Sequence, residues 1–93
     1  MIEKELDELT EELLKKKGFK NQLIICIEEL SELQKELCKF LRGKFAMQNI
    51  IEEVADVEIM LHQIKHIFNI DENLINYVKK QKIERTKNKI KND

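Results

Sequence analysis

The stretch "IEELSELQKEL", from Ile27 to Leu37, has the spacing of an amphipathic helix. At about 100° per residue, it shares one apolar face with its flanking residues. That face consists of Leu23, Cys26, Leu30, Leu33, Leu37 and Leu41. Two carboxylates, Glu29 and Glu32, lie three residues apart on the flank of the same face. The stretch therefore predicts a core helix with an acidic edge.

A second stretch, "IIEEVADVEIML" from Ile50 to Leu61, repeats this combination. Its apolar face consists of Ile50, Val54, Val57, Leu61, Ile64 and Phe68. Glu53 falls at the edge of that face, and Asp56 lies on its flank. A carboxylate removed from water without a partner is costly, so we expect a cation or a hydrogen-bond network beside Glu53.

Two arrangements would supply that cation. In the first, a lysine from another helix neutralises Glu53, and the other acids are ordinary surface residues. In the second, both helices turn their pairs of acids toward one seam, where a divalent cation neutralises the four charges. Hard oxygen ligands favour Mg²⁺ or Mn²⁺ over zinc.

Composition extends the helical prediction to the whole chain. The 93 residues include no proline and two glycines, and 42% of them are hydrophobic. Such a chain is expected to form one all-α domain over residues 1–93. The apolar spacing predicts four helices with short connections, which is typical of a four-helix bundle. The predicted boundaries are a first helix ending near Gly18, a second capped by Asn21 and ending near Arg42, a third from Met47 to Phe68, and a fourth capped by Asp71.

Charge and hydropathy exclude several classes of partner. The formal net charge is −1, which gives no global field for nucleic acid or a membrane surface. We expect a soluble cytoplasmic protein, because long apolar runs are missing and Met1–Glu5 lacks the order of a signal peptide.

His62 and His66 have metal-ligand spacing, but "HQIKH" lacks the central glutamate of a zincin, which favours surface histidines.

The order and spacing of the acids resemble the signature of the MazG-like, all-α nucleoside triphosphate pyrophosphohydrolases. That signature is Glu-x-x-Glu, a spacer, then Glu-x-x-Asp, and "EELSEL" followed by "EEVADV" fits it. Glu29 and Glu32 match the first pair, and Glu53 and Asp56 match the second. The likeness runs from about Asn21 to Arg85. With a single copy of the unit, the chain resembles the short, phage-like or housekeeping branch.

The resemblance implies Mg²⁺-dependent cleavage of a nucleoside triphosphate into the monophosphate and pyrophosphate, and it points to deoxynucleotides as the substrates. It implies that Glu29, Glu32, Glu53 and Asp56 are the catalytic metal ligands. The residues themselves suit such chemistry, because a metal ion must bridge acids and phosphate oxygens. Either Glu29 or Glu32 could instead be the general base. Base and sugar preference stay open.

Lys82 and Arg85 lie three apart on the predicted fourth helix, on the side of its apolar residues. They fit a Lys-x-x-Arg element of the same family, and a guanidinium and an ammonium can both bind phosphate oxygens. The alternative is that they belong to a solvated helix end, where cations suit the helix dipole. Gln22 lies about two turns before Glu29 on the same side, from where it could read a nucleobase.

The apolar faces of the predicted helices are larger than the area that one four-helix unit must bury. This excess predicts a homodimer or a homotetramer. Two other functions stay open. One is a helical interaction module or adaptor without catalysis, which would leave Glu53 and Asp56 unexplained. The other is a degenerate relative that binds nucleotide without hydrolysing it.

Overall fold

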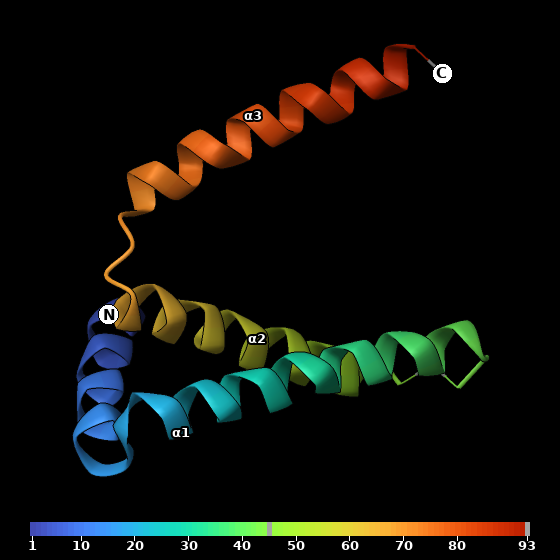
Figure 1. Ribbon diagram of the computed structural model, residues 1–93. Helices are drawn as coiled ribbons and strands as arrows, with labels where there is room; N and C mark the ends of the chain where they lie inside the picture. The colour runs from blue at the N-terminus through green and yellow to red at the C-terminus, as the bar shows by residue number, and fades with distance from the viewer. Residues whose placement is uncertain (45, 93) are drawn as a thin grey trace.

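The computed structural model describes residues 1–44 and 46–92. Over these residues the chain consists of α1 (Ile2–Leu41), α2 (Met47–Ile67) and α3 (Glu72–Lys91), joined by short connections and without any strand. Figure 1 shows the second half of α1 and α2 running side by side in opposite directions, with α3 standing apart. The all-α prediction is therefore confirmed.

The first two predicted helices are one helix with a bend at Gly18. This residue has φ 80° and ψ 159°, in a region that side chains with a Cβ avoid. The bend divides α1 into a first arm, residues 2–17, and a second arm, residues 19–41. Asn21 is not an N-cap, because the helix resumes before it; its Nδ2 instead donates a 2.8 Å hydrogen bond to the Lys17 carbonyl.

The remaining predicted boundaries are correct, including those of α2, which begins at Met47 and ends at Ile67. Gly43 follows the end of α1 with φ 79°, and its N–H donates to the carbonyl of Phe40 at 3.0 Å. Asp71 precedes α3, and its Oδ1 accepts a 3.1 Å hydrogen bond from the N–H of Asn73. Both contacts satisfy backbone groups that a helix end leaves unpaired.

The second arm of α1 packs on α2 along a narrow line. The buried apolar side chains of the described residues are Cys26 and Met60, at 1% and 8% exposure. Gln22 and Gln63 are buried beside them. The predicted core faces are partly wrong, because five of their members are exposed: Leu37, Leu41, Val54, Leu61 and Phe68. A single partner helix covers only a stripe of each face, and this stripe is rotated toward the acidic flank.

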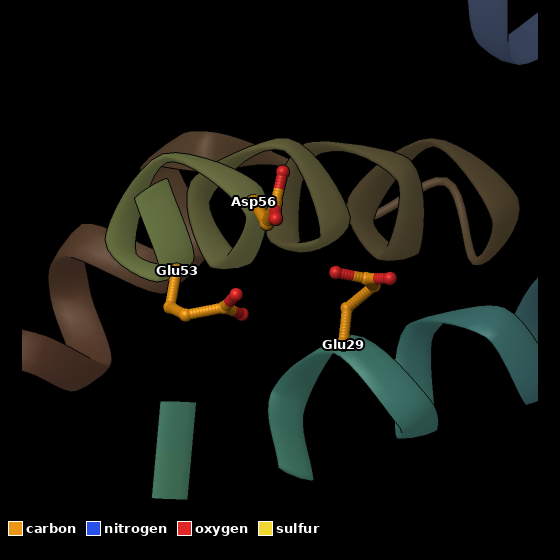
Figure 2. Close-up of side chains that lie close together, drawn as sticks. All are labelled: Glu29, Glu53 and Asp56. Carbon is orange, nitrogen blue, oxygen red and sulfur yellow. The ribbon is translucent and has the colours of Figure 1, made fainter. Parts of the chain in front are cut away.

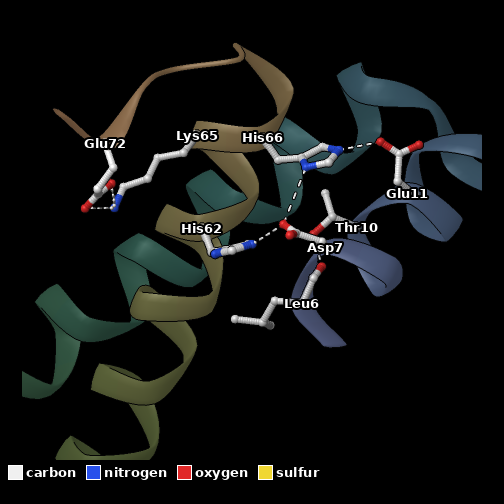
Figure 3. A network of polar contacts seen from close by, with 8 residues as sticks. All are labelled: Leu6, Asp7, Thr10, Glu11, His62, Lys65, His66 and Glu72. Atoms are coloured by element: carbon white, nitrogen blue, oxygen red, sulfur yellow. Dashed lines mark hydrogen bonds and ion pairs between the residues drawn. The ribbon is translucent and has the colours of Figure 1, made fainter. Parts of the chain in front are cut away.

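The first arm of α1 packs against the C-terminal half of α2 through polar contacts (Figure 3). His62 Nε2 lies 2.7 Å from Asp7 Oδ1, and His66 contacts both Asp7 and Glu11. Thr10, which is fully buried, donates to the Leu6 carbonyl at 2.6 Å. Both imidazoles are partly exposed, at 25%, as expected for surface histidines, and in addition they join α1 to α2.

α3 makes no long-range contact with α1 or α2 among the described residues, so one chain alone does not form the predicted four-helix bundle. Its start is fixed to the end of α2 by an ion pair between Lys65 and Glu72 at 3.0 Å. The Ile70 N–H also donates to the Lys65 carbonyl at 2.9 Å. The radius of gyration is 16.4 Å, compared with about 12 Å for a compact domain of this length.

Over the described ranges, none of the three helices has the combined length and apolar character that a membrane crossing needs.

Candidate metal centre

Three of the predicted metal ligands meet between α1 and α2. One carboxylate oxygen from each of Glu29, Glu53 and Asp56 lies within 4.8 Å of the other two. Figure 2 shows Glu29 reaching up from α1 toward the helix that carries the other two acids. All three side chains are half-buried. Helical spacing explains the meeting, since residues three apart on α2 lie on one side of the helix.

Glu53 carries the strongest sign of a missing partner. Its Oε2 is buried and has no hydrogen-bond partner among the described residues. No lysine, arginine or histidine in residues 1–44 and 46–92 forms an ion pair with Glu29, Glu53 or Asp56. The alternative in which a lysine neutralises Glu53 therefore has no support in a single chain.

The crowding of the acids changes their protonation. Burial raises the pKa of Glu29 above its usual value of 4.5, and the charges of Asp56, Glu53 and Glu32 raise it further. The pKa of Glu53 is raised by the same causes, burial first and then the charges of Asp56, Glu32, Glu36 and Glu52. A cation would relieve both effects, because it stabilises the charged form of each carboxyl group.

Glu32 stands at the edge of this group. Its side chain is exposed and does not belong to the set of oxygens within 4.8 Å. Its charge nevertheless contributes to the raised pKa of Glu29 and of Glu53. Glu36, one turn further along α1, is paired with Lys39 at 3.1 Å. The geometry thus separates Glu32 from the other three predicted ligands.

Lys82 and Arg85 do not reach the acids within one chain. Both are exposed on α3, where they line a hollow of about 420 Å³ with Val78 and Gln81. Since α3 stands apart from α1 and α2, the described part of a single chain does not join the predicted phosphate-binding and metal-binding residues.

The sequence interpretation missed the role of Gln22 and Gln63. Gln22 Nε2 donates a 2.8 Å hydrogen bond to Gln63 Oε1, in a position shielded from solvent on both sides. The sequence places Gln22 on the same side as Glu29 and suggests contact with a nucleobase, whereas the structure buries its side chain against α2. Its partner on α2 could not be recognised from spacing alone.

Comparisons with known proteins found no match that supports or contradicts the resemblance. No protein-family model, curated protein or solved structure matched the chain. The resemblance to MazG-like enzymes therefore depends on the motif residues alone.

Proposed function

We propose that the chain is a Mg²⁺-dependent hydrolase that converts nucleoside triphosphates into nucleoside monophosphates and pyrophosphate. The observation that carries the proposal is the meeting of Glu29, Glu53 and Asp56. In the described part of the chain no cationic side chain forms an ion pair with them, and the buried Glu53 Oε2 has no hydrogen-bond partner. Three carboxylate oxygens are a donor set suited to a hard divalent ion.

Each acid has a proposed part in the chemistry. Glu29, Glu53 and Asp56 would hold Mg²⁺, which would supply Lewis acidity toward the phosphate groups and toward the attacking water. Glu32 is exposed beside the three, so we assign it the role of general base that accepts a proton from the attacking water. The sequence alone leaves the general base open between Glu29 and Glu32, and the exposure of Glu32 favours Glu32.

The phosphate-binding role of Lys82 and Arg85 requires α3 to lie alongside α2. Asp56 precedes the end of α2 at Ile67 by about 16 Å of helix, at about 1.5 Å per residue. Lys82 follows the start of α3 by about 15 Å on the same scale. An antiparallel pairing in which the start of α3 lies beside the end of an α2 helix would therefore bring Lys82 and Arg85 level with the acids.

We propose that this pairing forms between copies of the chain, in a homodimer or homotetramer that completes a helical bundle. The accessible surface of one chain is 7762 Å², compared with about 5,700 Å² expected for a monomer of this mass. The excess of roughly 2,000 Å² is within the area that each chain of an obligate homodimer buries. Charge also favours the pairing between copies, because α3 is rich in lysine and the seam between α1 and α2 is acidic.

A helical interaction module remains the second candidate, and the exposed apolar residues of α3 favour it. Leu74 and Tyr77 are 58% and 61% exposed, and Ile70, Ile75 and Val78 line an apolar hollow nearby. Thermal melting with and without Mg²⁺ distinguishes the two. A metal-binding enzyme is stabilised by mass action, and an adaptor without a metal site is not.

The decisive experiment is an assay of pyrophosphate release from a panel of standard and modified nucleoside triphosphates with Mg²⁺. The proposal expects monophosphate and pyrophosphate in equal amounts. Release of inorganic phosphate instead would contradict cleavage between the α- and β-phosphates. Binding without any product would identify a nucleotide-binding protein rather than an enzyme.

A further inference from the structure

A buried pair of glutamines joins the second arm of α1 to α2. The hydrogen bond from Gln22 Nε2 to Gln63 Oε1 is 2.8 Å long, and the two residues are 2% and 1% exposed. Gln22 Oε1 is buried without a hydrogen-bond partner in the described part of the chain. Two apolar side chains of similar shape would avoid the cost of that unpaired oxygen. The pair is therefore not explained by stability.

The glutamines and the carboxylates are spaced alike on two antiparallel helices. Glu29 follows Gln22 by seven residues, and Asp56 precedes Gln63 by seven residues. Seven residues make about two turns, or roughly 10 Å of helix. Between the two levels, Cys26 Sγ lies 4.0 Å from the carbonyl oxygen of Met60. Whenever Gln22 is opposite Gln63, Glu29 is consequently opposite Asp56.

Apolar contacts alone do not select this alignment. Leucine, isoleucine and valine recur along both helices at spacings of three and four, so a slide by one turn would still bring apolar side chains together. The acids favour such a slide in the absence of a cation, because like charges repel at short range. A buried polar pair resists it, since its hydrogen bond forms in one register and is lost in the others.

We propose that Gln22 and Gln63 are positioning residues that fix the register of α1 against α2 and so hold Glu29 opposite Asp56. They act through the alignment of the helices, without touching metal or substrate. The effect of the pair on metal binding rests on the proposed function. Its effect on the helix register rests only on the hydrogen bond, the burial and the spacing.

The test replaces both glutamines by methionine, which keeps the unbranched shape and removes the amide. In Gln22→Met/Gln63→Met, the urea midpoint of unfolding is expected to stay or rise. The affinity of the substrate-free protein for Mn²⁺ is expected to fall at least about tenfold, as it does when the residues that orient metal ligands are replaced. The nuclear Overhauser effect between Met60 and Cys26 is expected to weaken as contacts of shifted registers appear. The control is Gln34→Met, at an exposed position of α1, which should change none of the three.

Two results would overturn the inference. A double variant with wild-type Mn²⁺ affinity and unchanged Met60–Cys26 contacts would remove any role in register. A double variant that does not fold would mean that the pair supplies stability instead. Failure of the proposed function would look different, because the wild type would then bind no Mn²⁺ while the contacts between Met60 and Cys26 would still report the register.

Discussion

Glu29 of α1 and Asp56 of α2 face one another across the seam between antiparallel helices, with carboxylate oxygens within 4.8 Å. Like charges this close repel, and the repulsion is stronger where the side chains are half-buried. Within residues 1–44 and 46–92, no cationic side chain pairs with either of them. The stability of the seam therefore depends on protonation or on a bound cation.

Without metal, the protein is expected to lose stability as pH rises from about 4.5. The pKa values of Glu29 and Glu53 are raised in the folded state, so the folded chain binds more protons than the unfolded chain between the usual and the raised values. Stability then falls with rising pH across that interval. Urea unfolding in EDTA from about pH 4 to about pH 8 measures the effect.

The comparison for this series is the Glu53→Gln variant, which removes one of the two groups. Its midpoint should fall less steeply with pH than that of the wild type, and saturating Mg²⁺ should flatten the wild-type profile. Parallel profiles for the two proteins in EDTA would contradict the raised pKa of Glu53.

Glu53→Gln should also abolish metal-dependent activity while leaving the fold intact. The amide removes a ligand charge, and turnover is expected to fall by at least about a hundredfold. At neutral pH without metal, the variant should be as stable as the wild type or more stable, because one repulsive charge is gone. Steady-state kinetics measures the turnover, and calorimetric melting with and without Mg²⁺ measures the stability. Glu58→Gln, an exposed acid on α2, is the matched control. If Glu53→Gln unfolds and Mg²⁺ does not stabilise the wild type, Glu53 is a structural residue.

Glu32→Gln should separate catalysis from metal binding. As general base, Glu32 contributes about 10²- to 10⁴-fold to kcat, whereas Mg²⁺ affinity of the free enzyme should stay nearly unchanged. The measurements are kcat with saturating Mg²⁺ and calorimetry without substrate. An equal loss in both quantities would make Glu32 a fourth metal ligand, as the sequence motif predicts.

Arg85→Ala should weaken nucleotide affinity or turnover about ten- to a hundredfold, the range of a lost charge-assisted hydrogen bond. Binding of Mg²⁺ to the free enzyme should not change, because the guanidinium gains its partner only with the triphosphate. Truncation after Asn88 removes neighbouring lysines of α3 and should do little, which makes it the control. Wild-type kinetics in Arg85→Ala would leave the basic residues of α3 as solvated surface.

Sedimentation equilibrium at micromolar concentration should detect a dimer or a tetramer. Val78→Glu is expected to shift the protein toward the monomer, because Val78 lies in the apolar hollow of α3 that we assign to the interface. Asn76→Glu adds the same charge at an exposed position elsewhere on α3 and should not. A monomeric wild type would reject the assembly and, with it, the route that brings Arg85 to the acids.

Local features of the sequence determined where the helices bend or end. Gly18 and Gly43 have positive φ angles, and Asp71 caps α3, as their residue types predict. Helical phase likewise sufficed to place Glu53 and Asp56 on one side of α2, because residues three apart are neighbours within any helix. These properties involve only a few consecutive residues.

Tertiary structure alone decided which faces meet. It buried Gln22 against Gln63, paired His62 with Asp7, and left Glu32 outside the group that Glu29 joins. Such choices depend on the register and rotation of one helix against another, and many registers satisfy the same apolar periodicity. The position of α3 belongs to this class as well. Its apolar residues meet neither α1 nor α2 in the described part of the chain, and nothing in its local sequence specifies where it packs.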